Sequence, residues 1–384
     1  MKISATLLFL LSCIMAAAQQ TTPSVEGASL GTARNVHAIG NLYTSGQFGK
    51  DDIAAFKERK IRRVISLRTA GEVKWDEAAA VKSAAIKFDS IPFGSADTLN
   101  DSVFDQVRRL LRRRGKVLLH CGSANRVGAV WLTYRVLDQG VPLKAALTEA
   151  KTIGLRTPGF QTKAVDYITR TLAKTGGMLS VKPGINDPFD GPDLDIPGFL
   201  KKFEVESREI YSQRRDILAA CELKPGYHIA DVGAGTGLFT NAMARAVGKA
   251  GWVYAVDIAP KFLDRINKLA VKEKLTNVGS VLCSPTSVTL PTASIDLAFV
   301  CDTYHHFEYP SLNLASLHRA LKPGGRLIII DFERIVGKTR PWILGHVRAN
   351  KETFTEEIVS AGFTLKKQVK VKGLKENYFL VFER

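Results

Sequence analysis

The stretch Asp231-Val232-Gly233-Ala234-Gly235-Thr236-Gly237 decides the fold of the C-terminal half of this 384-residue chain. It follows the apolar run 227–232 and precedes a helical pattern over 238–247. Glycines at such a junction permit a tight turn and let a ligand approach the backbone at the helix N-terminus. The next strand-like run ends at Asp257, about 20 residues further on, where a carboxylate can accept hydrogen bonds from ribose hydroxyls. The sequence therefore predicts a nucleotide-type site in an α/β fold.

The spacing of the glycines separates two families that share such a loop. A dinucleotide-binding loop reads G-x-G-x-x-G, whereas this loop reads G-x-G-x-G after Asp231. In this it resembles the class I S-adenosylmethionine (SAM)-dependent methyltransferases, whose first motif reads like D-V-G-A-G-T-G. The segments 290–297, 321–327 and 361–363 resemble later motifs of the same family. The resemblance implies SAM as cofactor and a Rossmann-like, seven-stranded sheet.

The resemblance also implies a role for each residue of the cofactor site. The methionine part of SAM would lie along Gly233, Ala234, Gly235 and Gly237, its amino group near Asp231, its ribose on Asp257 and its adenine on Ile258. Many relatives have an acid near Thr286 or Ser287 for the adenine amino group. This chain has Ser284-Pro285-Thr286-Ser287, so hydroxyls or a backbone group would have to serve.

The segment Cys301-Asp302-Thr303-Tyr304-His305-His306-Phe307 follows the fourth strand-like run, where the resemblance places the methyl acceptor. The sulfonium is already activated, so the protein mainly aligns acceptor, methyl and sulfur. An acceptor that carries a proton also needs a base, and histidine is the natural base near neutral pH. We expect His305 or His306 to act, with Asp302 and Tyr304 shaping the site.

Two alternatives accompany this hypothesis. One histidine of the pair can simply pack while the other is solvated, and His346-Val347-Arg348 is a second candidate face. A metal bound by the adjacent histidines is not expected, because adjacent residues on a helix point apart. The cysteines are widely spaced without a C-x-x-C pair, so they indicate neither a zinc site nor a dense disulfide framework.

A second motif, His120-Cys121-Gly122-Ser123-Ala124-Asn125-Arg126, follows the apolar run 116–120 and opens a helical pattern. A thiolate at a helix N-terminus is activated, and an arginine on the same loop can clamp phosphate. With 41–47 and 64–68, this motif resembles the protein tyrosine and dual-specificity phosphatases, chiefly a bacterial branch.

The phosphatase resemblance implies Cys121 as nucleophile, Arg126 as phosphate ligand, and Asp97 or Asp89 as general acid. Active phosphatases place five residues between Cys and Arg, whereas Gly122 to Asn125 are four. Phosphatase catalysis, binding of a phosphate-bearing ligand and a purely interactive role are therefore all compatible with this loop.

Length and composition predict two globular domains, since 45% of residues are hydrophobic and 24% charged. Strand and helix signals alternate over 33–175 and again over 199–384. We therefore expect an α/β protein in which a phosphatase-like parallel sheet with helices precedes the methyltransferase sheet. The breaker-rich segment 176–198 predicts a linker, and 19–32 a tether.

Residues 1–18 are typical of an export signal, with Lys2, an apolar stretch up to Met15 and small residues before Gln19. The apolar stretch is too short to span a bilayer. This predicts a periplasmic or secreted protein, or a lipoprotein acylated at Cys13, which conflicts with the cytoplasmic supply of SAM.

The net charge of +17 favours acidic partners, but the sequence carries no nucleic-acid-binding motif. We expect a SAM-dependent methyltransferase acting on a small molecule, with a phosphate-bearing ligand as a further candidate for the N-terminal domain. The alternatives are a Cys-dependent phosphatase with an accessory SAM-binding domain, and a binding module without enzymatic activity.

Overall fold

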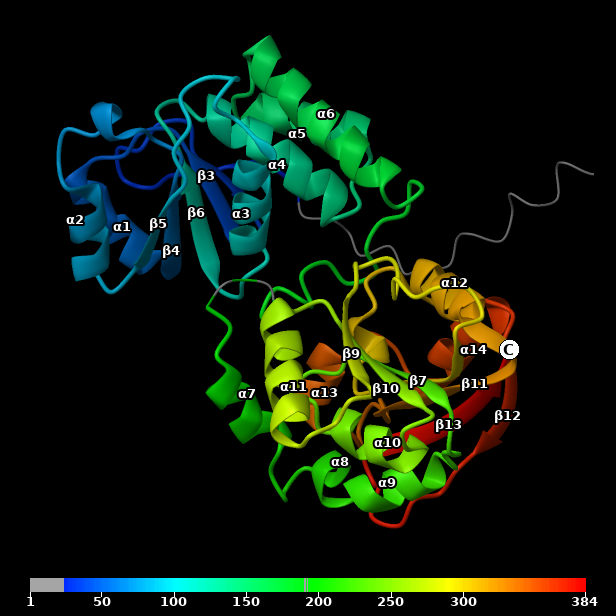
Figure 1. Ribbon diagram of the computed structural model, residues 1–384. Coiled ribbons are helices and arrows are strands. Elements are labelled where there is room, and N and C mark those ends of the chain that lie inside the picture. Colours follow the sequence, from blue (N-terminus) through cyan, green and yellow to red (C-terminus); the bar gives the residue numbers. More distant parts are fainter. Residues whose placement is uncertain (1–23, 190, 192) are drawn as a thin grey trace, which may run out of the picture. The chain divides into compact units, whose positions relative to one another are not determined.

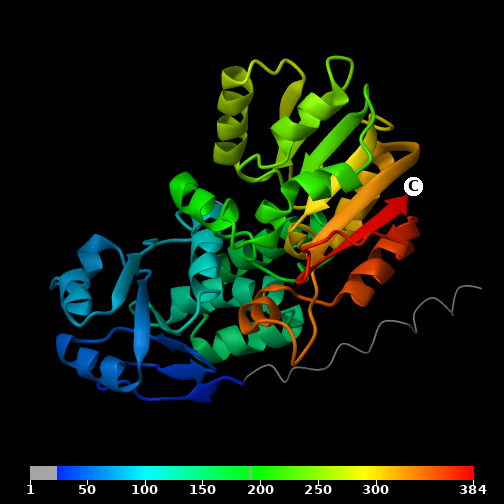
Figure 2. The ribbon, with the colours of Figure 1, turned by 90° about the horizontal axis from the view of Figure 1, so that it is seen from below.

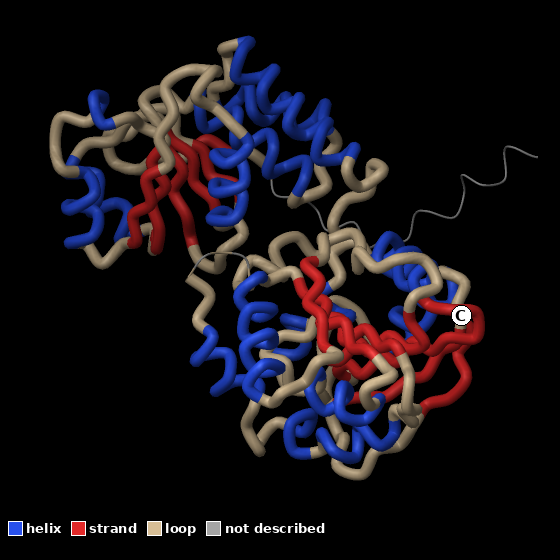
Figure 3. Tube along the Cα trace, viewed as in Figure 1, coloured by secondary structure: helices blue, strands red, loops and turns tan. Residues whose placement is uncertain are grey.

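The computed structural model describes residues 24–189, 191 and 193–384. The chain forms two compact units, of which the first ends at Ile168 and the second begins at Thr169. In Figure 1 the first unit runs from blue to green and the second from green to red. Each unit has a central sheet with helices around it (Figure 3). The predicted export signal, residues 1–18, lies outside the described residues. Within the described ranges, no helix is both long and apolar enough to cross a membrane.

The first unit contains a six-stranded sheet in the order β1-β2-β3-β6-β4-β5. The strands are β1 (Glu26–Gly27), β2 (His37–Ile39), β3 (Leu42–Ser45), β4 (Ile61–Ser66), β5 (Lys87–Ser90) and β6 (Lys116–His120). Strands β3, β6, β4 and β5 are parallel, whereas β1 and β2 are antiparallel to their neighbours. The sheet is therefore mixed, not purely parallel as predicted, because residues 26–45 add a short antiparallel edge.

From residue 24 onward, six α-helices and two short 3-10 helices accompany this sheet. They are η2 (Lys50–Asp52), α1 (Ile53–Glu58), η3 (Ala70–Glu72), α2 (Glu77–Ser83), α3 (Asp101–Leu111), α4 (Asn125–Leu137), α5 (Leu143–Ile153) and α6 (Pro158–Ala173). Helix α4 is buried over almost its whole length, as expected of a helix without a polar face. The described part of the predicted tether belongs to this fold, since Leu30 is fully buried and the Thr32 amide donates to Asp52 Oδ1 over 2.6 Å.

The second unit contains a seven-stranded sheet in the order β12-β13-β11-β10-β7-β8-β9. The strands are β7 (His228–Val232), β8 (Trp252–Asp257), β9 (Val278–Leu282), β10 (Ile295–Cys301), β11 (Leu321–Phe332), β12 (Thr364–Gln368) and β13 (Asn377–Glu383). All are parallel except β13, which is antiparallel to both of its neighbours. The red arrow of β13 lies beside the orange β11 in Figure 2.

The last two strands form an antiparallel pair at one edge of the sheet. Strand β13 lies between β11 and β12, so β12 is the edge strand. Burial explains the arrangement, because β13 is buried over Asn377–Phe382 whereas every residue of β12 is exposed.

The helices of the second unit cover both faces of its sheet. They are α7 (Ile196–Phe203), α8 (Glu209–Ser212), α9 (Arg214–Ala220), α10 (Thr240–Val247), α11 (Pro260–Lys272), η4 (Tyr304–His306), α12 (Pro310–Ala320), α13 (Pro341–His346) and α14 (Lys351–Ser360). The central strand β10 supplies alternate residues to two cores. Leu297 and Phe299 belong to one core, and Ala298 and Val300 to the other.

The described residues of the predicted linker 176–198 include several that pack against the rest of the second unit. The Val181 amide donates to the carbonyl of Glu308 over 2.9 Å, and Asn186 Nδ2 donates to the carbonyl of His306 over 3.0 Å. The side chains of Ile185 and Leu194 are buried. The glycines and prolines of this segment are compatible with turns, but some of its apolar side chains are nevertheless buried.

Candidate functional site

A cavity of about 630 Å³ lies in the second unit, where β7, β8, β10 and β11 reach their carboxyl ends. The carboxyl ends of parallel strands are the usual ligand-binding edge of such a sheet. The volume falls within the range of small-molecule sites. The cavity is lined by the glycine loop, by Asp257 and Ile258, and by three histidines.

The glycine loop joins β7 to the turn before α10, and it needs glycine for two different reasons. Gly233 has a φ of 71°, and a Cβ there would lie 2.3 Å from Thr303 Cγ2. The loop after β10 therefore approaches the glycine loop more closely than any side chain would permit. At Gly235, with a φ of 53°, a Cβ would meet only the Gly233 carbonyl oxygen, at 3.8 Å. The space above Gly235 is open, so a ligand can lie against its backbone.

Asp257 at the end of β8 and Asp231 in β7 are the buried acids of this part of the cavity. The Gly235 amide donates to Asp257 Oδ2 and the Ala259 amide to Asp257 Oδ1, both over 2.8 Å. The Thr240 hydroxyl donates to Asp231 Oδ2 over 2.6 Å. Burial raises the pKa of both carboxyl groups, that of Asp231 to about 7. These are the residues that the sequence assigned to the ribose and the amino group.

The remaining predicted cofactor residues also lie at this site. Ala234, Ile258 and Ser284 line the cavity. Gly237 does not line it; this glycine has a φ of 85°, and a Cβ there would lie 2.8 Å from Ile266 Cγ1. Thr286 and Ser287 do not line the cavity; the Thr286 hydroxyl instead lies 3.2 Å from the Ser284 hydroxyl. Of the residues that replace the missing acid, Ser284 is thus the hydroxyl that faces a ligand.

Asp302 and Tyr304 take different positions from each other. Asp302 lines the cavity, where it forms an ion pair with Arg208 and accepts from Asn377 Nδ2 over 2.5 Å. Burial raises the pKa of Asp302 to about 6. Tyr304 is fully buried in the core, and its hydroxyl donates to Glu357 Oε2 over 2.8 Å. The tyrosine therefore supports η4 from behind and does not face the cavity.

His305 and His306 lie in the 3-10 helix η4, and their rings face each other with centroids 4.4 Å apart. The expectation that adjacent residues point apart does not hold here, because hydrogen bonds to other parts of the chain fix the orientation of both rings. His305 Nδ1 lies 2.8 Å from Asp331 Oδ1, and His306 Nδ1 lies 3.1 Å from Asn186 Oδ1. Burial lowers the pKa of both histidines, that of His305 to about 3, so both imidazoles are neutral.

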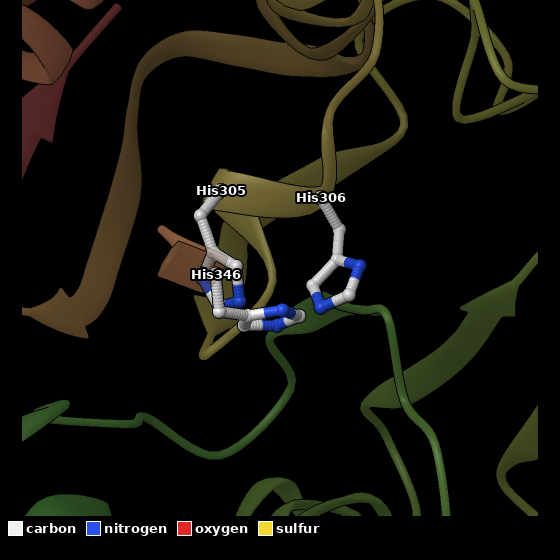
Figure 4. A group of neighbouring side chains, drawn as sticks. All are labelled: His305, His306 and His346. Carbon is white, nitrogen blue, oxygen red and sulfur yellow. The ribbon is translucent and has the colours of Figure 1, made fainter. Parts of the chain in front are cut away.

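His346, from the second candidate face, completes a three-histidine cluster at the end of α13. Its ring centroid lies 5.0 Å from that of His305 and 5.1 Å from that of His306. Figure 4 shows the three rings turned toward the same space. One nitrogen from each ring lies within 4.8 Å of the other two, a spacing compatible with a metal ion.

The Cys121 loop of the first unit lies between β6 and α4. The Cys121 side chain is buried, and Arg126 in α4 forms a two-pronged ion pair with Glu72. Arg126 Nη1 also donates to the carbonyls of Leu67 and Phe93, over 3.0 and 2.7 Å. The Arg126 partner lowers the pKa of Glu72 to about 2. A carboxylate therefore holds the guanidinium at the place where a phosphate would be clamped.

In the described structure, the two candidate general acids of the first unit form no hydrogen bond with the residues of the Cys121 loop. Asp97 is exposed in the loop between β5 and α3. Asp89 lies in β5 and forms an ion pair with Arg63. Neither has a hydrogen bond to Cys121 or Arg126 among the described residues.

Several residues of both sites were missed from the sequence. Asp331 is the second-last residue of β11, so the rule that carboxyl strand ends meet could have indicated it. Asn186 and Arg208 precede the sheet, and Glu72 lies far from Cys121 in the chain; no local motif marks them. They become recognisable only through the contacts described above.

Comparison with protein families gives a match to a family described as "Methyltransferase domain" over residues 230–329, from β7 to β11. The chain is 30% identical over 118 residues to the ubiquinone/menaquinone biosynthesis C-methyltransferase UbiE of Burkholderia multivorans, covering 31% of this chain and 48% of the relative. The same enzyme of Paraburkholderia xenovorans is 28% identical with the same coverage. The chain thus spans about half the length of these relatives.

Two solved structures are each similar to part of this chain. A SAM-dependent methyltransferase from Aquifex aeolicus is 26% identical with a TM-score of 0.44, covering 49% of this chain and 97% of that one. TpbA of P. aeruginosa is 25% identical with a TM-score of 0.32, covering 39% of this chain and 91% of that one. The family and relative matches support SAM as the cofactor, as predicted from the glycine loop.

Proposed function

We propose that the C-terminal unit is a class I SAM-dependent methyltransferase domain, and that it transfers the SAM methyl group to a small-molecule acceptor bound beside the histidine cluster. One observation carries the proposal: a single cavity is lined both by the glycine loop with Asp257 and by His305, His306 and His346. Methyl transfer requires acceptor and cofactor in one enclosed space, because catalysis consists mainly of their alignment.

The residues around the glycine loop fit the cofactor. When bound, SAM supplies the electrophilic methyl group on its sulfonium. Each oxygen of Asp257 accepts one backbone N–H and keeps a lone pair for a ribose hydroxyl. Asp231 has a raised pKa, and an ammonium group beside it would stabilise its ionised form. The open space above Gly235 leaves room for the methionine part.

The acceptor region combines aromatic walls with two oriented bases. Phe332 lies 5.7 Å from the His305 ring and 5.2 Å from the Trp342 ring, centroid to centroid, and all three line the cavity. These rings favour a flat, largely apolar acceptor. A neutral His305 that donates from Nδ1 to Asp331 keeps its Nε2 lone pair available for a proton of the acceptor. Asp302, tied to Arg208 and Asn377, would position the loop that carries these histidines.

The proposal is tested by calorimetric titration of the whole chain with SAM and S-adenosylhomocysteine. Asp257→Ala removes the charged acceptor of the ribose hydroxyls and should weaken binding about 10–100-fold, since such hydrogen bonds contribute about 1.5–3 kcal/mol. The control is Asp264→Ala, which removes an exposed acid on α11 and should bind normally. Folded wild-type protein that binds neither ligand would overturn the proposal. An acceptor screen follows only if binding is saturable.

For the N-terminal unit we propose binding of a phosphate-bearing ligand at the Cys121 loop, by exchange of the Glu72 carboxylate for phosphate on Arg126. The two-pronged Arg126–Glu72 pair supports this, because guanidinium binds carboxylate and phosphate with the same geometry. Binding is a better candidate than hydrolysis. The Cys121 thiol is 1% exposed, and the loop is one residue shorter than in active phosphatases of the family it resembles.

This second proposal is tested by titrating wild type and Glu72→Gln with inorganic phosphate. The amide no longer competes as an anion for Arg126, so Glu72→Gln should bind phosphate more tightly than wild type. Equal or absent binding in both proteins would contradict the exchange. Release of phosphate from an aryl phosphate, lost in Cys121→Ser, would instead support the phosphatase alternative.

We also propose that residues 1–18 direct export, on the sequence pattern alone. Cell fractionation with the intact N-terminus tests this. A full-length, wholly cytoplasmic product would refute it, and would also remove the conflict with the supply of SAM.

A further inference from the structure

We propose that His305, His306 and His346 bind one divalent transition-metal ion, with zinc the first to test, and that the acceptor's oxygen or sulfur occupies its open coordination position. The metal site stands on the geometry of the cluster. The role of the open position rests, in addition, on the methyl transfer proposed above.

The hydrogen bonds of the cluster assign which nitrogen of each ring is available. Asp331 Oδ1 and Oδ2 accept the backbone N–H groups of Phe332 and His305, over 2.7 and 3.1 Å, so this carboxylate acts as an acceptor toward His305 Nδ1–H. Asn186 Nδ2 donates to the His306 carbonyl, which orients Asn186 Oδ1 as the acceptor from His306 Nδ1–H. Both histidines therefore present Nε2 with its lone pair.

This arrangement is the one that metal-binding histidines usually have. A ligating imidazole typically donates its other N–H to a carboxylate or an amide oxygen, which fixes the tautomer and the ring orientation. His305 has such a carboxylate partner and His306 an amide partner. The His346 ring has no hydrogen-bond partner among the described residues, so either of its nitrogens is available.

A single imidazole is sufficient to accept one proton from an acceptor. A cluster of three neighbouring imidazoles therefore indicates a function other than proton transfer alone. Three histidine nitrogens and one open position are, however, a common set for a catalytic zinc ion. Tetrahedral zinc with bonds of about 2.0–2.1 Å separates its ligand nitrogens by about 3.4 Å. The nitrogens lie within 4.8 Å of one another, so the rings must close by up to about 1.4 Å. His306 and His346 are only partly buried and can supply this movement by side-chain rotation.

Of the charged groups around the cluster, some favour a bound cation and others disfavour it. The cations of Lys182, Arg208 and Arg348 disfavour further positive charge near His305, whereas Asp331 favours it. Lys182 Nζ donates to the carbonyls of Gly345 and His346 at the end of α13, so its charge is partly compensated there. The same contacts fix the backbone that carries His346. Neutral ligands and one nearby carboxylate match a borderline ion such as zinc better than calcium or magnesium.

A ligand in the open position would lie in the cavity that also holds the glycine loop. An acceptor hydroxyl or thiol bound there would lose its proton to water more readily, and this replaces proton transfer to His305, because the ion then occupies the Nε2 lone pair of that ring. Its lone pair would then attack the methyl carbon. A new O–C or S–C bond forms, the sulfonium S–C bond breaks, and S-adenosylhomocysteine leaves as a neutral thioether.

The test uses the untagged whole chain, stripped with a chelator and titrated with Zn²⁺ against a chromophoric competitor. We expect one Zn²⁺ per chain, and intense visible absorption when Co²⁺ replaces it. His346→Ala should lower zinc affinity at least about 100-fold, and Asn186→Ala, which removes the support of His306, about 10–100-fold. The control is His318→Ala, a partly buried histidine of α12 outside the cluster, which should bind zinc like wild type.

The outcomes separate this proposal from the methyltransferase proposal. Absence of stoichiometric zinc binding, or equal binding by wild type and His346→Ala, overturns the metal site. SAM titration of the same stripped protein reports on the other proposal. SAM binding without zinc binding refutes the metal site alone, and zinc binding without SAM binding refutes the proposed transfer alone. Retained SAM affinity in His346→Ala shows that this variant is folded.

Discussion

Substitution of Gly233 by alanine tests whether the loop after β10 really presses against the glycine loop. An alanine there must adopt a φ of 71°, at a cost of about 1–2 kcal/mol. Its Cβ would also lie 2.3 Å from Thr303 Cγ2, and overpacking of this kind costs about 1–3 kcal/mol more. Gly324→Ala is the matched control, since Gly324 has a φ of 72° with no atom within 4 Å of a Cβ. The control should show the backbone cost alone.

The assay is thermal unfolding with and without SAM, in which the transition that SAM shifts identifies the second unit. For a domain of this size about 1 kcal/mol corresponds to about 2–4 °C. Gly233→Ala should therefore melt about 2–12 °C below Gly324→Ala. Adding Thr303→Gly to Gly233→Ala should recover most of that difference, with Thr303→Gly alone completing the cycle. Equal melting of the two alanine variants, or no recovery in the double variant, would refute the close approach.

Two further predictions concern single side chains. The pair with Arg126 lowers the pKa of Glu72 from its ordinary value of 4.5 to about 2. The pair therefore stabilises the folded state fully above about pH 4.5, and this stabilisation is lost as the pH falls toward 2. Urea unfolding of wild type and Glu72→Gln across this range should show the extra acid sensitivity in wild type only, and parallel curves would contradict the pairing. Tyr304→Phe removes the hydrogen bond to Glu357 and should lower the free energy of unfolding by about 1–3 kcal/mol. The affinity for SAM should not change, because Tyr304 does not line the cavity. A loss of SAM binding measured by calorimetry would contradict this and place the hydroxyl at the site.

The sequence predicted those parts of the second unit whose signals are local. The glycine loop, Asp257 and the strands ending at Val232, Asp257 and Cys301 are short apolar runs with a turn or an acid at a fixed offset. Strand β9, Val278–Leu282, was missed because it contains Gly279 and Ser280 and has no continuous apolar run. Strand β12 has no recognisable sequence pattern, because none of its residues is buried and its side chains therefore need not alternate between apolar and polar.

The histidine cluster depends on contacts that no local pattern contains. His305 and His306 were expected from their place after β10, but the rule that neighbours diverge assumes a regular helix free of competing partners. In η4 the rings are oriented instead by Asp331 from β11 and Asn186 from the segment before the sheet. His346 joins them from α13, about 40 positions later in the chain. Tertiary hydrogen bonds thus decided the orientation of these rings.

Two separate stretches of the chain line the cavity: the strands with their loops, and the segment before the sheet that contains Asn186. The glycine loop directly follows β7 and Asp257 ends β8, so changes there are expected to disturb both the fold and the cofactor site. Asn186 and Phe189 reach the same cavity from a segment that contributes no strand. Substitutions at these two positions therefore remove no hydrogen bond between strands. Acceptor preference and cofactor affinity should therefore be separable traits in this protein, adjustable one at a time.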